Sequence, residues 1–359
     1  MADIKNKTDE TTAKTTTNNE FVGGGLEQAM TLVKSVKNTE YYKTTREITK
    51  QALRPVSRDG DLFNSNVLSS EAKKYALMLK GNKGKDSETQ LLSEIGDGLN
   101  CGHTGRLVVE ALCEILYEQS LDAGTDQELL GYTQKIASKT GLPILLDNHS
   151  SIGTSEDHKS MFTYIPTRTV DIAKKIYGNR KISGKEKELV SNALTKLAKS
   201  EFPIVRKNRK TIFVPLVVIE ARGIDEDTGA ESFLLRLSPI FTSEAKNNFI
   251  GKRKDYIQIM RLCKTGIARK LLDKITLAMS FKSHNNENWP KYIIRKDILL
   301  DNIAVGGEYV EHKSRINKDY DKAVTILKEN TVIFDYKESS DYGDGYLYCI
   351  FDCNPDFIK

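Results

Sequence analysis

The hydrophobic and polar positions of the chain form the same pattern twice, and the first copy lies in its middle part. Apolar residues at helical spacing predict helices over 105–119, 170–178 and 185–199. Two β-branched, apolar runs without helical period follow at 211–220 and 232–241, separated by a turn rich in Gly and Asp. Two such runs around such a turn predict a β-hairpin.

The second copy of the pattern lies near the C-terminus. Apolar spacing predicts a long helix over 254–280, a short helix over 295–304 and a third helix over 314–329. Apolar runs at 332–337 and 346–351 then predict a second hairpin. A helix-turn-helix followed by a hairpin is the winged-helix arrangement. We therefore predict an α+β protein with two tandem winged-helix domains.

The domain limits follow from composition as well as from this repeat. The 359 residues suit two or three domains. Residues 1–22 are rich in Thr, Lys, Asn and Glu and nearly lack apolar residues, so we expect a disordered N-terminal tail. A short helix and a polar linker are expected over 23–65. The first winged-helix domain is placed over 66–245 and the second over 246–359, the latter including the connecting helix 254–280.

The charged residues are unevenly distributed along the chain. The net charge is only +5, but residues 161–220 hold 13 Lys and Arg against 5 Asp and Glu, and residues 245–282 hold 10 against 2. Residues 61–160 are acidic, with 9 Lys and Arg against 15 Asp and Glu. Such asymmetry favours a polyanionic partner.

Composition excludes several other classes of protein. Hydrophobic residues make up 39% and charged residues 29%, which is typical of a soluble globular protein. The longest apolar runs fall well short of a membrane span, and the N-terminus lacks the apolar segment of a secretory signal. Five irregularly spaced cysteines fit the reducing cytoplasm.

Catalytic and metal-binding motifs are not supported by the sequence. Residues 81–85 lack the spacing of a P-loop. Cys101 and His103 have no companion pair to complete the four ligands of a zinc site. Tyr41 and Tyr42 lack the His cluster that a rolling-circle nuclease would use. We therefore expect a protein that is not an enzyme and that holds no cofactor or metal.

The third helix of the second copy carries the chemistry expected of a DNA recognition helix. Arg315, Lys318 and Lys322 are spaced i, i+3, i+7 and so share one face. Ser314 and Asn317 lie near its N-terminal end, where such a helix meets base edges, and Asn can pair with adenine and Arg with guanine. A basic face on a single helix is more often just a solvated face, so the prediction depends on its recurrence.

The first copy repeats this chemistry. Asn192, Lys196 and Lys199 share a face of the helix over 185–199, and the basic run 206–210 follows at the entry of the hairpin. We expect base readout from Asn192, Ser314, Arg315 and Asn317. The full set of predicted DNA-binding residues is Lys187, Asn192, Lys196, Lys199, Arg206, Lys207, Arg209, Lys210, Lys313, Ser314, Arg315, Asn317, Lys318 and Lys322.

Acidic residues at the hairpin turns oppose a simple DNA contact by the wings. The first turn holds residues 225–227 (Asp, Glu, Asp), and the second holds Asp341 and Asp344. These charges would repel phosphate, so we expect the tips to point away from DNA. The apolar strands of the first hairpin could instead serve a protein contact.

This arrangement resembles the replication initiator (Rep) proteins of theta-replicating plasmids over roughly residues 100–355. The segments that carry the resemblance are LVVEALCEILYEQ, VDIAKKIYG, KELVSNALTKLAK, TIFVPLVVIE with SFLLRLSPIF, and DILLDNIAV with RINKDYDKAVTILKE. The resemblance implies binding of repeated double-stranded origin sites, homodimerisation through the first unit, and recruitment of host replication proteins. It also implies the absence of a catalytic centre.

Three alternatives stay open at this point, of which an enzyme is disfavoured because no catalytic constellation is found. A transcription regulator with the same fold would present the same residues. A protein-interaction protein would use the two units to bind a protein and would not be retained on DNA at low salt.

Overall fold

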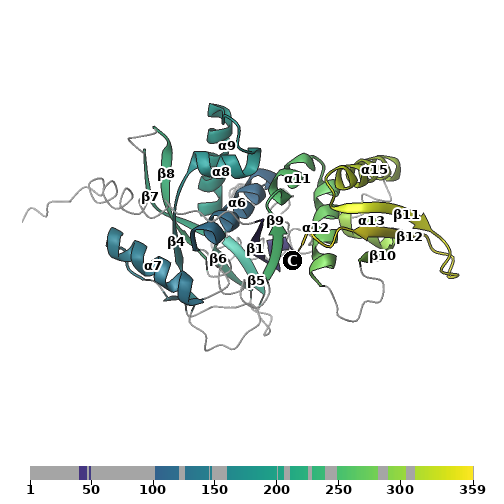
Figure 1. The fold of residues 1–359 in the computed structure, drawn as a ribbon, viewed down its shortest axis with the longest axis horizontal. Helices are drawn as coiled ribbons and strands as arrows, with labels where there is room; N and C mark the ends of the chain where they lie inside the picture. Colours follow the sequence, from purple (N-terminus) through teal and green to yellow (C-terminus); the bar gives the residue numbers. More distant parts are fainter. Residues whose placement is uncertain are drawn as a thin grey trace, which may run out of the picture.

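The computed structural model describes the chain from residue 40 onward, with gaps. The described residues are 40–46, 48–49, 102–120, 126–144, 146–147, 160–199, 201–205, 211–224, 229–238, 249–281, 290–304 and 312–358. The predicted tail over 1–22 and the short helix predicted after Gly25 lie outside them. The mixed α+β class is confirmed: helices and small antiparallel sheets alternate along the chain (Figure 1).

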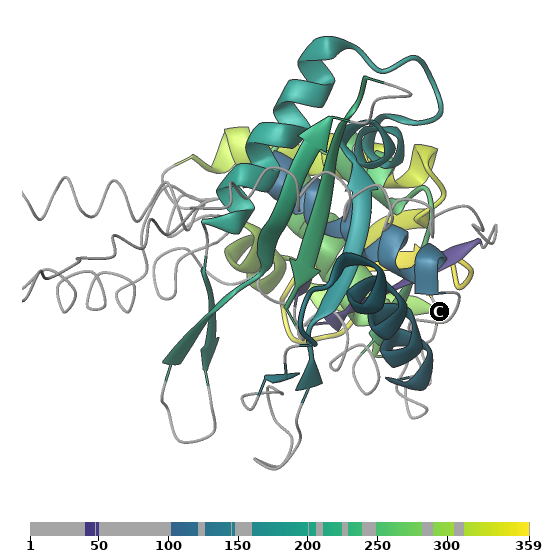
Figure 2. The ribbon, with the colours of Figure 1, turned by 90° about the vertical axis from the view of Figure 1, so that its left-hand side faces the viewer.

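The first unit is built from three helices and a three-stranded antiparallel sheet. Its strands lie in the order β4-β8-β7, side by side in Figure 2. Helix α6 packs against both α8 and α9. The elements, in chain order, are α6 (Gly102–Ser120), β4 (Thr163–Arg168), α8 (Thr169–Tyr177), α9 (Gly184–Ala198), β7 (Val217–Ile224) and β8 (Glu231–Leu237).

The second unit repeats this order of elements and this sheet topology. Its strands lie in the order β10-β12-β11, so the first strand of the unit again pairs with the last. Helix α12 packs against α13 and α15, as α6 packs against α8 and α9. The elements are α12 (Gly266–Ser280), β10 (Lys291–Arg295), α13 (Lys296–Ile303), α15 (Lys313–Glu329), β11 (Ile333–Ser339) and β12 (Tyr348–Cys353).

Smaller elements surround the two units. The strand β1 (Tyr41–Thr45) pairs with β9 (Phe249–Arg253). The other elements outside the two units are two strand pairs and two helices. These are α7 (Asp126–Thr140), β2 (Leu146–Asp147) with β3 (Ser160–Met161), β5 (Glu201–Val205) with β6 (Thr211–Pro215), and α11 (Tyr256–Leu262).

The prediction of one long helix over 254–280 is wrong, because the helix is interrupted between α11 and α12. Cys263, which follows α11, has φ −71° and ψ 78°, outside the helical region. Thr265 then caps α12 by accepting a hydrogen bond from the backbone N–H of Ala268 at 3.2 Å. Tyr256, Met260, Leu271 and Ile275 are buried as the apolar spacing predicted, but on two helices.

The predicted first hairpin needs a similar correction. The run 211–220 divides at Leu216: β6 pairs with β5, whereas β7 pairs with β8. Only the part from Val217 onward joins the predicted partner. Each sheet also contains a strand that the pattern did not predict, β4 in the first unit and β10 in the second, each leading directly into a helix.

Part of the predicted polar linker over 23–65 belongs to the fold. The strand β1 pairs with β9 along its full length, from Tyr41 opposite Arg253 to Thr45 opposite Phe249. Tyr42 and Ile48 are fully buried. The linker prediction is therefore wrong for residues 41–49, because two large side chains from this segment fill the core.

One hydrophobic core runs through both units. It includes Leu112 of α6, Leu194 of α9, Ile257 of α11, Leu271 of α12 and Leu327 of α15. Helix α11 contacts α6 and α8 of the first unit and α15 of the second, and it lies between them in Figure 1. The predicted limit at 245/246 lies outside the described residues, and the domain limits stay a prediction.

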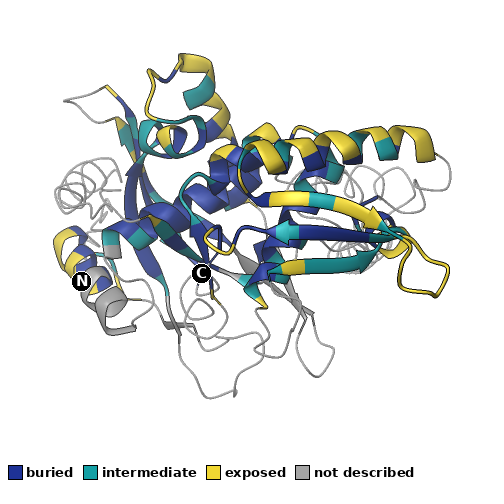
Figure 3. Cartoon of the chain, turned by 45° about the vertical axis from the view of Figure 1, so that its right-hand side comes forward, coloured by how far each residue is buried: buried dark blue, intermediate teal, exposed yellow. Residues whose placement is uncertain are grey.

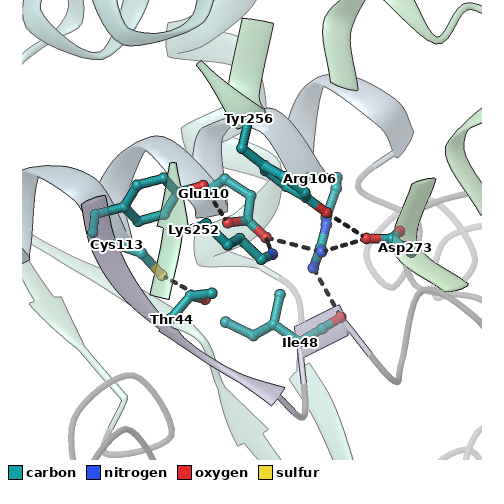
Figure 4. Close-up of polar contacts among 9 residues, drawn as sticks. Thr44, Ile48, Arg106, Glu110, Cys113, Lys252, Tyr256 and Asp273 are labelled. Carbon is teal, nitrogen blue, oxygen red and sulfur yellow. Dashed lines mark hydrogen bonds and ion pairs between the residues drawn. The ribbon is translucent and has the colours of Figure 1, made fainter. Parts of the chain in front are cut away.

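A buried network of charged residues joins the two units inside this core (Figure 4). Glu110 of α6 accepts a hydrogen bond from Lys252 Nζ of β9 at 2.7 Å and lies 2.8 Å from Arg106 Nη2. Arg106 also reaches Asp273 of α12 at 3.3 Å and donates to the carbonyl of Ile48 at 2.8 Å. All four charged side chains are at most 3% exposed.

Two tyrosines complete the network. Tyr42 donates to Glu110 Oε2 at 2.8 Å, and Tyr256 donates to Asp273 Oδ1 at 2.7 Å. Burial opposes ionisation of Glu110, but Lys252 and Arg106 together hold its pKa below the usual value. The network thus keeps a carboxylate charged in the core and ties β1, β9 and α12 to α6.

A second cluster of ion pairs extends the contact along α6. Glu118 accepts hydrogen bonds from Lys175 of α8 and Lys254 after β9, at 2.6 Å in each case. Glu114 accepts from Lys175 at 2.9 Å. Glu110, Glu114 and Glu118 are spaced i, i+4, i+8, so one face of α6 presents three carboxylates to lysines from other elements.

We expect Glu110→Gln to lower the free energy of unfolding by about 3–5 kcal/mol, because it removes the carboxylate that pairs with Lys252 in the core and leaves Arg106 with Asp273 alone. Asp335→Asn is the control, since it breaks the exposed pair of Asp335 with Lys328 and should cost less than about 1 kcal/mol. Urea unfolding measures both. Equal losses in the two variants would contradict the role of the network.

Candidate nucleic-acid interface

Helix α15 presents a buried face and an exposed polar face. Ile316, Tyr320 and Leu327 are fully buried. Tyr320 packs edge-on against Tyr336 of β11, with ring centroids 5.9 Å apart, which fixes the helix on its sheet. The opposite side of the helix is exposed along its length, as the burial colours of Figure 3 show.

A shallow depression of about 750 Å³ lies along this exposed face. Of the six residues of this helix predicted to bind DNA, the depression brings together all but Arg315, which is exposed outside it. Asp321 and Thr325 also line it, and neither was among the predicted residues. The described lining residues are Lys313, Ser314, Asn317, Lys318, Asp321, Lys322 and Thr325.

The depression is cationic and polar. Lys318 and Lys322 form no ion pair with any other residue that the structure describes, and both are exposed. Asp321 lies between them in the sequence and adds one negative charge. The Oδ1 atom of Asn317 is buried and accepts no hydrogen bond within the described segments. The amide oxygen can accept a hydrogen bond only from an N–H or O–H donor of a ligand, whereas the two lysine side chains are suited to an anionic group.

The hairpin beside α15 is acidic and aromatic at its tip. Asp344 accepts hydrogen bonds from the Tyr348 hydroxyl at 2.5 Å and from the Tyr346 backbone at 3.1 Å. Tyr346 is 45% exposed, and the centroid of its ring lies 3.5 Å from the guanidinium carbon of Arg295. Asp341 is exposed as well. The tip thus keeps exposed carboxylates, as the sequence predicted, and its contact with DNA stays untested.

In the first unit, α9 repeats the division into two faces. Val190, Leu194 and Leu197 are buried, as predicted. Asn192, Lys196 and Lys199 are exposed and Lys187 is half-buried, so these predicted residues lie away from the core.

The N-terminus of α9 is firmly capped. The Ser183 side chain accepts a hydrogen bond from the backbone N–H of Glu186 at 3.3 Å, and Glu186 accepts from the Ser183 backbone at 2.9 Å. Arg180 also pairs with Glu186, and these hydrogen bonds lower the pKa of Glu186 to about 2. The cap fixes where α9 begins.

The basic run containing Arg206, Lys207, Arg209 and Lys210 lies outside the described residues, as does the acidic turn 225–227. Their predicted roles therefore stay predictions.

Helices α9 and α15 both lie in the upper part of the molecule as drawn in Figure 1. Figure 1 places α11 between them, and α11 contacts both α8 of the first unit and α15 of the second. Helix α7 lies toward the opposite, lower end in Figure 1.

Of the Cys101 and His103 pair near the start of α6, only His103 is described. Both ring nitrogens of His103 are buried and accept or donate no hydrogen bond to other described groups. Burial, together with Arg269 and Arg106, lowers the pKa of His103 to about 4. In the ranges that the structure describes, no group of three or more His, Cys, Asp or Glu side chains could hold a metal ion.

Tyr41 and Tyr42 have structural roles. Tyr42 donates to Glu110 inside the core, and the Tyr41 hydroxyl donates to the carbonyl of Asp356 at 2.6 Å.

Comparison with known proteins does not assign the chain. No protein-family model and no curated protein matches the sequence. Among the described helices, none is both long enough and apolar enough to cross a lipid bilayer.

We expect the free energy of unfolding to fall as pH is lowered from about 6.5 to about 4, in part through His103. In this range the unfolded chain protonates His103 at its ordinary pKa, whereas the folded chain does not. His103→Gln removes this contribution, so its loss of stability between pH 7 and pH 5 should be smaller. Urea unfolding at the two pH values measures the difference. Identical losses in both proteins would contradict the low pKa.

Proposed function

We propose that the chain binds double-stranded DNA, with α15 and α9 as the recognition helices of two winged-helix units. The observation that carries the proposal is the depression on α15, where five residues predicted from the sequence come together. Two of these five, Lys318 and Lys322, form no ion pair with other described residues. Lysines supply affinity for phosphates, and Ser and Asn side chains can reach base edges.

The topology supports this assignment of the helices. In both units a strand leads into two consecutive helices, and a hairpin follows whose second strand pairs with that first strand. This is the order of a winged helix, in which the second helix of the pair enters the major groove. In such an arrangement α15 and α9 hold equivalent positions, and both expose polar and basic residues.

The proposed biological role is initiation of replication at repeated origin sites, as in the plasmid initiators that the chain resembles. The two proposed recognition helices, both in the upper part of the molecule in Figure 1, support binding to two adjacent segments of a single duplex. A plasmid carrying the chain's own origin should be maintained only when the gene is intact. If the protein instead changed expression of a neighbouring gene without supporting maintenance, it would be a transcription regulator.

We expect Lys318→Glu with Lys322→Glu to weaken binding to duplex DNA at least about tenfold, and to reduce the slope of log affinity against log salt by about two. Each lysine that contacts a phosphate releases about one counterion, and each glutamate adds repulsion. Fluorescence anisotropy with labelled duplexes over a salt series measures both quantities.

The matched control is Lys135→Glu with Lys139→Glu, which makes the same charge change on α7, at the opposite end of the molecule (Figure 1). This control should keep most of the affinity. Equal losses in the two double variants would show a general charge effect, and absence of any duplex binding at low salt would favour a protein-interaction role.

We expect Asn317→Ala to relax discrimination at one base pair of a selected duplex, by about 1–3 kcal/mol. The duplex is first selected from a random pool with the unaltered protein, and affinities for all four bases at each position are then compared. Arg315→Ala should relax specificity less, because Arg315 lies outside the depression. An unchanged preference in Asn317→Ala would remove this residue from the base-reading set.

A further inference from the structure

The two proposed recognition helices do not account for the positive charge of the segment 245–282, which lies outside both of them. Residues 245–282 hold 10 Lys and Arg against 2 Asp and Glu. Lys252 and Lys254 are used by the carboxylates of α6, and Arg253 pairs with Asp255 at 2.7 Å. Arg261 and Lys264, at the corner between α11 and α12, form no ion pair with other described residues.

Arg261 lies against the first unit, at the end of α8. Its guanidinium carbon is 5.7 Å from the ring centroid of Tyr177, and the guanidinium carbon of Arg180 is also 5.7 Å from that centroid. Tyr177 is the last residue of α8, and Arg180 follows in the turn before α9. Two arginines from different elements therefore share one aromatic ring.

The backbone at the end of α8 allows this close approach. Gly178 has φ +85°, a conformation that side-chain-bearing residues rarely adopt, and it turns the chain beside α11. A Cβ atom at Gly178 would lie 3.9 Å from the Gln258 side chain of α11. The turn of the first unit is thus packed against the helix that carries Arg261.

The two arginines differ in their partners. Arg180 is held by Glu186 in the cap of α9, although its side chain stays 54% exposed. Arg261 has no carboxylate partner in the described part of the chain, and its Nε atom is buried without a hydrogen-bond acceptor. A guanidinium that is oriented by a ring but lacks an anion is suited to bind a phosphate.

We propose that Arg261, supported by Arg180 and Tyr177, is a binding site for a backbone phosphate of the DNA duplex. This inference depends on the proposed function, since it places the site beside the N-terminus of the recognition helix α9. The site lies on α11, between the two units, so it contacts the duplex between the segments that α9 and α15 read. Lys181 and Lys264 are exposed and close in sequence to these arginines, and they add positive charge.

The test compares Arg261→Gln and Arg261→Lys with the unaltered full chain. Arg261→Gln should weaken binding about tenfold, equally for a selected duplex and for a scrambled duplex, and should reduce the salt slope by about one. Arg261→Lys keeps the charge and should retain most of the affinity. Lys135→Gln, on α7, removes one charge elsewhere and should leave the slope unchanged. Urea unfolding of each variant shows whether the fold is kept.

The outcomes separate this site from the proposed function. A slope unchanged in Arg261→Gln, while Lys318→Glu with Lys322→Glu still loses binding, would overturn the phosphate site alone. A loss confined to the selected duplex would also overturn it, since a phosphate contact carries no sequence preference. Failure of the unaltered protein to bind any duplex at low salt would overturn both proposals. If Arg261→Gln does not fold, the folded Arg261→Lys variant serves as the test. A loss of affinity in Arg261→Lys as large as that of Lys318→Glu with Lys322→Glu would overturn the phosphate site, because Arg261→Lys keeps the positive charge.

Discussion

The arrangement of the molecule depends on the charged face of α6. Glu110, Glu114 and Glu118 follow one another at every fourth position. They pair with Lys252 of β9, with Lys175 of α8 and with Lys254, which directly follows β9. Burying such charges is expensive, and ion pairs in a core often add little net stability. Their effect is instead to penalise every arrangement that leaves one of them without its partner. The network therefore specifies how β9, and α11 and α12 after it, sit on the first unit.

This constraint has a consequence for the proposed DNA contact. Helix α15 packs on α12, and α12 is tied to α6 through Asp273 and Arg106. Helix α9 packs on α6 from another side. The two helices proposed to read DNA are therefore held by one central helix through a continuous core. Such a protein would read two segments at a fixed separation, rather than two sites joined by a flexible linker.

The sequence predicted the parts of this fold that local spacing controls. The apolar positions of α9 and α15 repeat every three to four residues, so spacing alone assigns their buried and exposed faces. The polar face that holds the depression on α15 follows from that assignment. The presence of Asp321 in the depression was not predicted, because an acidic residue does not fit a phosphate-binding pattern. The strands β4 and β10 escape prediction because each is short and continues directly into a helix, which leaves no turn signal between them. The start of α12 does carry a local signal, because Thr265 is of a residue type preferred at the N-cap and directly precedes the apolar positions of the helix.

The partners of the basic residues could not be found in this way, because charge pairing in this chain is mostly non-local. Lys252 and Glu110 are 142 positions apart, and Lys254 and Glu118 are 136 apart. A count of charges over 245–282 treats Lys252 and Arg261 alike, although the first is fully buried with a carboxylate and the second meets none among the described residues. Only the fold divides the segment into cations that hold the two units together and cations that remain for a ligand. The excess charge of this segment that favours a polyanionic partner is thus smaller than the sequence implied, and Arg261 and Lys264 at the corner between α11 and α12 are part of what remains.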